Sequence, residues 1–512
     1  MTLSLLREQI GVAQGSNDLV SIARAEFRTM AVRCVQAGAP LVFMYALDER
    51  STRRVFVVRA VFSVPGSGFL TLTVDVPEQE LSYPSLTTEI MAAHWFERLI
   101  FDQYGLVAEE HPDWRRLMHH ENIPAHVYPL RKDFAWNTKL PYASEPYPMH
   151  AVQGDGIYEI PVGPIHAGII EPGHFRFNVR GERIVTLEGK LFFKHKGVEK
   201  LVEGKTPAEA LPFIERVSGD MVVAHTLAFA EAVEHASGMS ISARADSLRM
   251  LWLEMERLTA HIFDIGNMGG MGTGFTFMAA QCFRVVEELR RMHYAIVGHR
   301  YLRGAITLGG AHDISQKNRE DLDALLTKVE TELETLCGIA YANDGLMERF
   351  ETTGVLSRAA AIAYGARGVP ARASGVTSDM RRDHPSGAYT RIPVTVATKT
   401  SGDVRARFSV RVLECAESLR LARLCLTQLP QGPAYTKFSV HAGSSLGWAE
   451  SFRGAVIDWV RIDTSGKLDR VAISDPSFCN WSLFGEIGPG NIVPDFPLCN
   501  KSLNLSYSGT DL

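Results

Sequence analysis

The sequence of 512 residues has few cysteines, no strong excess of charge and no long apolar run. Its 7 cysteines include no C-x-x-C pair and none with a histidine at zinc-like spacing, so neither a zinc site nor a cysteine-held iron–sulfur cluster is indicated. Lys+Arg total 53 and Asp+Glu 58, and this mild acidity argues against a nucleic-acid binder. No apolar run approaches the roughly 20 residues that a membrane helix needs.

What is present is the composition of an ordinary globular chain. Hydrophobic residues make up 46% and charged residues 22%, which is enough apolar material for a sizeable core. The first segment, 1–12, carries Arg7 and Glu8 inside its apolar stretch, unlike a secretory signal. The odd, scattered cysteines are typical of reduced thiols in the cytoplasm.

The N-terminal part is expected to be a small α/β domain. Residues 41–45, 54–63 and 69–76 are β-rich and separated by turn residues, and 87–104 has the apolar period of a helix. The segment 137–156 is rich in proline and glycine, which favour an extended linker. We therefore predict a domain over 1–135, a linker over 136–157 and a second domain over 158–512.

The second domain is expected to be mainly helical, with short peripheral strands. Thr206-Pro207-Ala208-Glu209 has the pattern of a helix start, with an N-cap, a proline at N1 and an acidic first turn. The overall fold class is therefore α+β. Strands are expected at 158–161, 173–179 and 183–187, and helices at 207–235, 242–268, 275–302, 315–350 and 402–429.

Three generic motifs are weak. Gly443–Gly447 fits G-x-S-x-G, but a turn between strands is favoured over a nucleophile elbow. The glycine-rich run 266–274 lacks dinucleotide-binding spacing and favours a flexible connection between helices. His111, His119 and His120 lack regular ligand spacing, so surface histidines are favoured over a metal site.

Longer motifs in the N-terminal part are more specific. Residues 97–102 read E-R-L-I-F-D, 111–117 read H-P-D-W-R-R-L and 129–133 read P-L-R-K-D, in that order. This part resembles the small hydrophilic "C" component of respiratory complex I. Arginine and aspartate clusters of this kind favour contacts between subunits over catalysis.

The remainder is similar to the quinone-site subunit of complex I and to the large subunit of membrane-bound [NiFe]-hydrogenases. The fused order, with the small hydrophilic part first, resembles the formate hydrogenlyase large subunit. The motifs that carry the resemblance are Gly163-Pro164-Ile165-His166, Glu171-Pro172-Gly173-His174-Phe175, His195-Lys196-Gly197-Val198-Glu199, Glu215–Met221, Phe263-Asp264-Ile265-Gly266, Ala371–Val376, Arg381–Pro385, Asp475-Pro476-Ser477 and Asn491–Pro497.

The hydrogenase ligand motifs are degenerate. The resemblance implies four cysteine ligands, two in R-x-C-G-x-C and two in D-P-C-x-x-C, because soft thiolates hold nickel. At those positions this sequence has Ser218, Met221, Ser477 and Asn480, and Cys479 lies one place off. We infer that the chain has no nickel–iron centre and binds no metal of its own, and we expect the tail from Asn491 to be retained and packed.

The resemblance to complex I implies a quinone cavity with a hydrogen-bonding histidine and an aspartate paired with it. By motif order His166 takes the histidine position and Asp264 the aspartate position, which together form a candidate proton relay. The position of the quinone tyrosine falls in 218–220, where there is none. A buried, satisfied pair without turnover is the alternative.

A dense charged cluster follows, for which the resemblance implies a place along the cavity and the route to the membrane subunits. We favour that functional role over a solvated face. Nearby, Glu254, Glu256, Arg257 and His261 are favoured as an ordinary salt-bridged helix face. The cluster consists of Arg372, Asp379, Arg381, Arg382, Asp383 and His384.

Taken together, these features predict a subunit of a membrane-associated, hydrogenase-related and complex I-like oxidoreductase. Electrons would come from a 4Fe-4S cluster in a partner subunit, a quinone is a candidate acceptor, and redox chemistry would be coupled to proton or ion translocation. The expected partners are a small iron–sulfur subunit, a ferredoxin-like subunit, and antiporter-like and anchor membrane subunits, on the cytoplasmic side of the cell membrane. The alternatives are a non-catalytic scaffold or a hydrogenase with atypical ligands.

Overall fold

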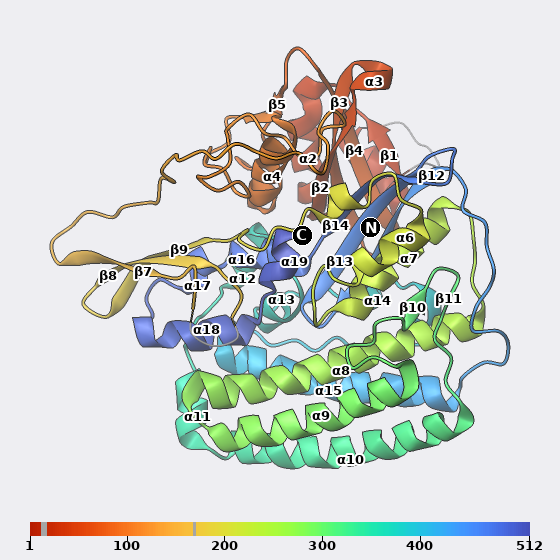
Figure 1. The fold of residues 1–512 in the computed structure, drawn as a ribbon. Coiled ribbons are helices and arrows are strands. Elements are labelled where there is room, and N and C mark those ends of the chain that lie inside the picture. The colour runs from red at the N-terminus through yellow and green to blue at the C-terminus, as the bar shows by residue number, and fades with distance from the viewer. Residues whose placement is uncertain (12–17, 167–169) are drawn as a thin grey trace.

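A computed structural model of the chain describes residues 1–11, 18–166 and 170–512. The N-terminal part is built on a four-stranded sheet in the order β1-β4-β3-β2 (Figure 1). Its strands are β1 (Leu19–Ser21), β2 (Leu41–Glu49), β3 (Val55–Val64) and β4 (Gly68–Pro77), so the three predicted β-rich segments are confirmed. Helices α1 (Leu3–Ile10), α2 (Phe27–Gln36) and α4 (His94–Tyr104) pack on it.

Both faces of this sheet are buried, which explains why its strands read as almost continuous apolar runs. One face receives α1 and α2, and the other meets the second part of the chain. There the ring of Tyr45 stacks on Trp459 with centroids 4.9 Å apart. The N-terminal domain is therefore packed against the rest of the molecule.

Residues 138–153 contain no helix or strand, as the proline-rich composition predicts. After them β7 (Ile157–Val162), β8 (His174–Arg180) and β9 (Arg183–Lys190) form an antiparallel sheet that projects to the side in Figure 1. The exact domain boundaries stay predictions.

Long helices form the base of the molecule (Figure 1). They are α8 (Ala243–Thr273), α9 (Thr276–Val297), α10 (Gln316–Tyr341) and α15 (Val404–Thr427), with α15 and α9 both packed on α8. Above them α7 (Val222–Ala236) is buried along almost its whole length. The fold class is thus a mixture of helix and sheet, as predicted.

A second antiparallel sheet lies between the two halves and packs on α7. It has the order β12 (Gly443–Ser451), β13 (Gly454–Ile462) and β14 (Leu468–Ser474). Gly447 permits this contact, because a Cβ there would lie 2.1 Å from the carbonyl oxygen of Ala228 on α7. The last segments, α16 (Pro476–Trp481), α18 (Phe496–Leu503) and α19 (Tyr507–Asp511), then return to the centre of the molecule.

The remaining elements are short. They are α3 (Arg50–Arg53), α5 (Val198–Leu201), α6 (Pro207–Ile214), α11 (Asp344–Phe350), α12 (Arg358–Ala363), α13 (Gly368–Ala373), α14 (Met380–Asp383), α17 (Phe484–Ile487), β5 (Ser82–Pro84), β6 (Val107–Glu109), β10 (Ile306–Thr307) and β11 (Gly310–Ala311).

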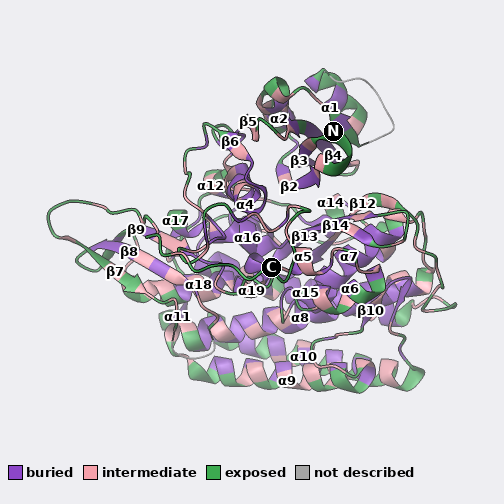
Figure 2. Ribbon diagram, turned by 45° about the horizontal axis from the view of Figure 1, so that its top comes forward, coloured by how far each residue is buried: buried purple, intermediate pink, exposed green. Residues whose placement is uncertain are grey.

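The apolar core falls into two large clusters. One fills the space among the long helices, α7 and β12–β14, and the other joins the N-terminal sheet to β8, β9 and α16. Figure 2 shows the buried residues concentrated where these layers meet. Because the second cluster crosses the predicted linker, the two parts of the chain stabilise one another.

The start of α6 follows the predicted signal. Thr206 and Glu209 form a capping box, in which the Glu209 carboxylate accepts from the Thr206 N–H at 2.9 Å. The predicted helix over 207–235 is nevertheless wrong as a single element, because it breaks between α6 and α7. The helix predicted from residue 87 begins only at His94.

The expectations for the two glycine motifs are also corrected. Residues 266–273 are not a flexible connection but the last turns of α8, because the glycines let α9 approach closely. A Cβ on Gly270 would lie 2.2 Å from the Cβ of Ala279, so packing outweighs the poor helix propensity of glycine. Gly443–Gly447 lies inside β12 rather than in a turn.

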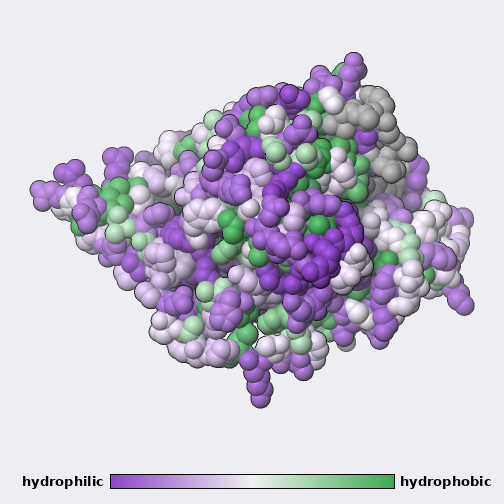
Figure 3. Space-filling view, turned by 90° about the horizontal axis from the view of Figure 1, so that it is seen from above, coloured by the Kyte–Doolittle hydropathy of each residue, from purple (hydrophilic) through white to green (hydrophobic). Residues whose placement is uncertain are grey.

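The surface seen from above is largely hydrophilic, with small separate hydrophobic groups (Figure 3). Within the described residues, none of the helices combines the length and apolar character needed to span a bilayer.

Candidate functional site

The four positions that the motifs align with metal ligands are all buried. Ser218 lies just before α7 and Met221 is its N-cap residue, while Ser477 and Asn480 lie on α16. Ser506, which precedes α19, joins two of them. Its Oγ lies 3.0 Å from the Oγ of Ser218, and its N–H donates to the Oγ of Ser477 at 3.0 Å.

The other two positions contact different groups. The Met221 sulfur lies 4.0 Å from a guanidinium nitrogen of Arg453. The Asn480 amide bonds both backbone groups of Arg367, at 2.9 and 3.1 Å. The nearby Cys479 is buried, and that burial raises the pKa of its thiol, so the neutral form is favoured.

This donor set does not fit a nickel–iron centre. Two hydroxyls, a thioether and an amide occupy the positions for which the resemblance implies four thiolates, and the two hydroxyls are already hydrogen-bonded through Ser506. Within residues 1–11, 18–166 and 170–512, no three side chains of His, Cys, Asp or Glu are grouped as metal ligands.

A chain of polar contacts leads from Ser218 to Asp264. Asp220 accepts from the Ser218 hydroxyl at 3.1 Å and forms a two-point ion pair with Arg453, at 2.8 Å for each bond. Arg453 in turn donates to the backbone oxygen of Asn504, whose side chain donates to Asp264 at 2.5 Å.

Asp264 lies on α8 and is almost fully buried. Its second carboxylate oxygen accepts from the Arg411 Nε at 2.9 Å. Burial raises the pKa of Asp264 to about 6, against the opposing effect of Arg411 and Arg453. This carboxyl can therefore exchange a proton close to neutral pH.

The predicted pairing of His166 with Asp264 is wrong. His166 lies half-buried on the loop after β7, and its Nε2 lies 2.7 Å from the carbonyl oxygen of Gly173. Both oxygens of Asp264 are bonded by Asn504 and Arg411 instead. The order of the motifs identified the two residues, but it carried no information on which side chain each would contact in the folded chain.

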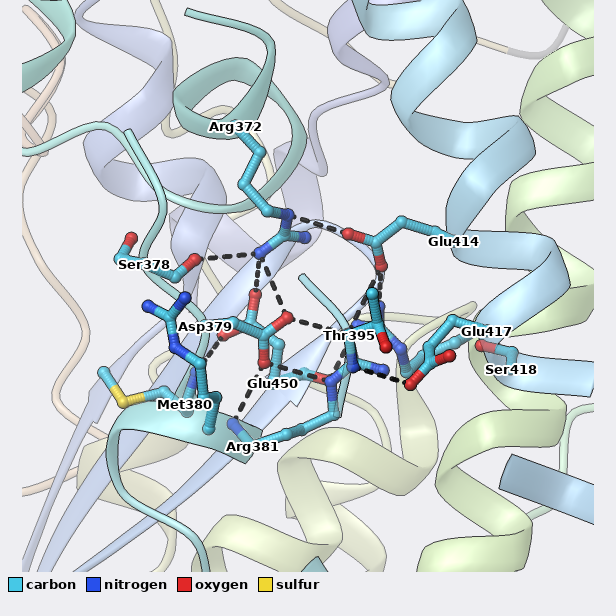
Figure 4. A network of polar contacts seen from close by, with 12 residues as sticks. Arg372, Ser378, Asp379, Met380, Arg381, Thr395, Glu414, Glu417, Ser418 and Glu450 are labelled. Atoms are coloured by element: carbon cyan, nitrogen blue, oxygen red, sulfur yellow. Dashed lines mark hydrogen bonds and ion pairs between the residues drawn. The ribbon is translucent and has the colours of Figure 1, made fainter. Parts of the chain in front are cut away.

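Three members of the predicted charged cluster do form a buried ionic network (Figure 4). Arg372 on α13 binds Glu414 on α15 and Glu450 on β12, each at 2.7 Å. Arg381 on α14 binds Asp379 at 2.7 Å. Glu414 and Glu450 were missed, because nothing in their local sequence distinguishes them from the many exposed glutamates.

Helix α8 contributes two further charged side chains to the network, Glu254 and Arg257. Glu254 accepts from Arg381 at 3.0 Å and from the hydroxyls of Tyr389 and Ser418, at 2.6 Å each. Arg257 on the next turn forms an ion pair with Glu414.

The salt-bridged face expected on this helix is confirmed for one pair, since Arg257 and Glu254 form an ion pair at 3.4 Å, but this face is buried inside the molecule. Glu254, Glu256, Arg257 and His261 are all buried, because α15 packs along the helix, the start of α7 covers Glu256, and Arg257 reaches the backbone of β12.

The charges in this network are unevenly distributed. Burial alone would raise the pKa of Glu414, but Arg372 and Arg257 hold it well below its usual 4.5. The pKa of Glu450 is raised instead, by burial and by the neighbouring Asp379. Burial lowers the pKa of His261 to about 4, so this ring is neutral near pH 7.

The other three members of the predicted cluster lie outside the network. Arg382 is partly exposed and pairs with Asp383. His384 faces the N-terminal domain, where its Nε2 lies 2.7 Å from the Ser63 hydroxyl and its ring stacks on Phe69 at 4.2 Å. These contacts give His384 a part in joining the two domains.

The expectation of surface histidines in the N-terminal domain is also wrong for two of the three. His111 and His119 are buried, and only His120 keeps partial exposure. Burial lowers the pKa of His111 to about 4 and that of His119 to about 3. The predicted packing of the tail from Asn491 is confirmed, since most residues from Leu498 to Leu512 are buried.

Three family models match successive parts of the chain. Residues 20–139 match the 30 kDa subunit of respiratory-chain NADH dehydrogenase, 196–267 match nickel-dependent hydrogenase, and 270–440 match the 49 kDa subunit of respiratory-chain NADH dehydrogenase. This order agrees with the order of motifs along the sequence.

Curated proteins match over most of the chain. Hydrogenase-4 component G of Escherichia coli strain K12 is 33% identical, over 92% of this chain and 83% of its own length. Formate hydrogenlyase subunit 5 of the same strain is 32% identical, over 93% of this chain and 85% of its own. The C/D subunit of NADH-quinone oxidoreductase from Phocaeicola vulgatus is 29% identical, over 76% of each chain.

Proposed function

We propose that this chain, which belongs to the family of fused complex I-type subunits that includes hydrogenase-4 component G and formate hydrogenlyase subunit 5, works without a nickel–iron centre of its own. It is a subunit of a hydrogenase-related, complex I-like oxidoreductase. In our proposal it receives electrons from a 4Fe-4S cluster in a small iron–sulfur partner subunit and couples their transfer to proton or ion movement.

The observation that carries this proposal is the meeting of Ser218 and Ser477 on Ser506. Serine hydroxyls keep their protons near neutral pH and bind nickel poorly, while their mutual hydrogen bonds satisfy them inside the core. The segment 504–512 packs beside α16, where the Trp481 indole donates to the Ser506 backbone oxygen at 3.3 Å. In our proposal this segment takes the place of a bound metal.

The coupling role is supported by the buried ionic network. Its charges come from α8, α13, α14, α15 and β12, so a change at one element alters the ion pairs of the others. Buried ion pairs cost desolvation and gain little net stability, which favours a functional reason for a network of this size. We propose that it transmits redox-linked changes towards antiporter-like and anchor membrane partners, with the complex on the cytoplasmic side of the cell membrane.

Asp264 is the residue that we propose moves a proton. Its carboxyl is connected to Asp220 through Asn504 and Arg453, and its pKa of about 6 allows both protonation states. A quinone is the acceptor class that the resemblance to complex I suggests, and His166 and the network residues Arg372, Asp379 and Arg381 are candidates for its surroundings.

A second candidate function is a non-catalytic coupling scaffold. It is favoured by the full hydrogen bonding of Asp264 to Arg411 and Asn504, which resembles a structural ion pair. In that case the charged network would still transmit conformational change, but electron transfer would not depend on Asp264 or His166.

Metal analysis of the complex purified with its partners tests the first part of the proposal. We expect iron from partner clusters, nickel well below one atom per chain, and no dihydrogen-dependent dye reduction. Nickel near one atom per chain, or dihydrogen oxidation that is lost in S218A, would overturn it and favour a hydrogenase with atypical ligands.

The variants D264N and H166Q separate the two candidate functions. If Asp264 moves a proton, D264N lowers turnover of the intact complex and removes the pH dependence near 6, while the exposed H441Q serves as the matched control. Unchanged electron transfer in D264N and H166Q, with loss of ion movement only when Arg381 is replaced, would establish the scaffold instead.

A further inference from the structure

A cavity of about 300 Å³ lies between the N-terminal domain, β9 and α16, and its lining includes no residue of the ionic network. Its volume is at the lower end of the range for pockets that hold small organic molecules. Its lining includes aromatic rings, among them Trp95, Phe175, Trp481 and Phe484. It also includes charged side chains from α4, the 112–117 segment and β9.

The charged side chains of the cavity lining are mostly paired with one another. Arg98 forms an ion pair with Asp113 at 3.1 Å, and Arg115 binds the same carboxylate at 2.8 Å. Arg115 also pairs with Glu188. The positive charges of these two guanidiniums are therefore compensated by the negative charges of the two carboxylates.

Lys190, at the end of β9, is the cation left over. Only 6% of the residue is exposed, and its Nζ has no hydrogen-bond partner among the described residues. The ammonium lies 3.3 Å from the ring centroid of Tyr147, which also lines the cavity. A ring face attracts a cation but accepts none of its three strong hydrogen bonds.

The protonation of Lys190 is compatible with an anionic partner. Burial lowers its pKa to about 8, with attraction from Glu121 and Asp102 and repulsion from Arg98 and Arg116. Glu121 is exposed, and Asp102 accepts from the backbone of 117–119 through one oxygen while its other oxygen has no hydrogen-bond partner. Among the described residues neither carboxylate forms an ion pair with the ammonium, although both attract it. At pH 7 the site thus keeps a buried ammonium beside a cavity lined partly by aromatic rings.

We propose that this cavity binds a small organic anion with a flat apolar body, of the aromatic carboxylate class, with Lys190 as its counterion. The Lys190 ammonium, which Tyr147 covers in this structure, would turn towards the cavity and donate to the carboxylate. The ring would lie against Trp481 and Phe484, which already stack on one another at 5.1 Å. Since the walls come from both parts of the chain, a bound ligand would also hold the N-terminal domain and β9 together.

Calorimetric titration of the full chain with 2-naphthoate, and with the neutral 2-naphthamide for comparison, tests the proposal. For a ligand of this size we expect a Kd of about 1 mM or tighter for the anion. K190M should weaken binding of 2-naphthoate about tenfold or more, as loss of a charge-assisted hydrogen bond predicts. K190R, which retains the positive charge, should retain most of the affinity.

The exposed Lys194 provides the matched control, and K194M should bind as the natural chain does. Equal affinity for 2-naphthoate in the natural chain and K190M would overturn the proposal, as would absence of binding up to about 10 mM. Tighter binding of the neutral amide than of the anion would also overturn it, because Lys190 would then have no part in recognition.

Discussion

Replacing one glutamate of the ionic network should be far more damaging than replacing its neighbour. Glu414 and Glu450 are both almost fully buried and both bind Arg372 at 2.7 Å. Only Glu414 also forms ion pairs with Arg257 and, at 3.5 Å, with Arg381. We predict that E414Q strongly destabilises the chain and that E450Q does so weakly.

The charges of the network give the reason. Three guanidiniums, Arg257, Arg372 and Arg381, face four carboxylates, Glu254, Asp379, Glu414 and Glu450. The excess negative charge falls on Glu450, whose pKa is raised, whereas the three arginines hold the pKa of Glu414 well down. An amide at 450 therefore removes the least favourable charge, while an amide at 414 leaves buried guanidiniums without their common partner.

The expected magnitudes differ several-fold. Breaking a buried ion pair by removing one partner, as in E414Q, lowers the free energy of unfolding by about 3–5 kcal/mol. E450Q should cost about 1 kcal/mol, the typical value for the loss of one hydrogen bond. Unfolding entropy of about 2.1 cal/mol/K per residue gives about 1.1 kcal/mol/K for 512 residues, so E414Q should lower Tm by about 3–5 °C if the chain unfolds as one unit.

Scanning calorimetry at pH 7, supported by urea unfolding followed through tryptophan fluorescence, measures both variants against the natural chain. The exposed E334Q is a suitable control for the chemical change itself. Equal losses for E414Q and E450Q would refute the assignment of the excess charge to Glu450. A larger loss for E450Q would mean that Glu450 is the ionised centre of the network.

Three further predictions concern other buried groups. Glu231 is buried and its pKa is raised to about 8, so its contribution to stability is complete below pH 4.5 and is lost as the pH rises towards 8. E231Q should therefore be more stable than the natural chain at pH 8.5 by on the order of 2 kcal/mol. A stability difference between the two that stays constant from pH 5 to pH 8.5 in urea unfolding would contradict this. A Cβ on Gly509 would lie 2.2 Å from the Asp475 carboxylate, whereas one on Gly485 meets nothing within 4 Å. G509A should therefore lower the free energy of unfolding by about 1–3 kcal/mol and expose 504–512 to limited proteolysis. Equal behaviour of the control G485A would exclude this steric cause. The Tyr389 hydroxyl donates to Glu254 at 2.6 Å inside the network, so Y389F should cost about 1–3 kcal/mol, while Y435F at an exposed ring should be neutral in the same assay.

The N-terminal strands could be predicted because their signal is local. Residues 41–45, 54–63 and 69–76 are apolar stretches bounded by turn residues, and they fall on β2, β3 and β4. The bounds of β3 and β4 agree to within one residue, whereas β2 begins as predicted and continues four residues further, to Glu49. The capping box at Thr206 is equally local. The helical run 266–273 could not be predicted, since only the approach of α9 makes glycine favourable there.

The candidate site was partly predictable. Motif order identified Ser218 and Ser477, and it drew attention to Arg372, Asp379 and Arg381, which the structure joins in one network. It also suggested a pair of His166 and Asp264 that does not form. Spacing along the chain states which residue types are available, but it does not state which of them face one another.

By itself, then, the sequence determined the class of protein, the order of its parts and the presence of Ser218, Met221, Ser477 and Asn480 at four motif positions, because residue identity at a motif position needs no folding. Only the tertiary structure decided what these residues contact. Ser506 meets Ser218 across 288 residues and Glu254 meets Arg381 across 127, contacts that arise when distant segments share one core. Burial then sets the charge of each group, and burial is a property of the folded chain rather than of any local segment.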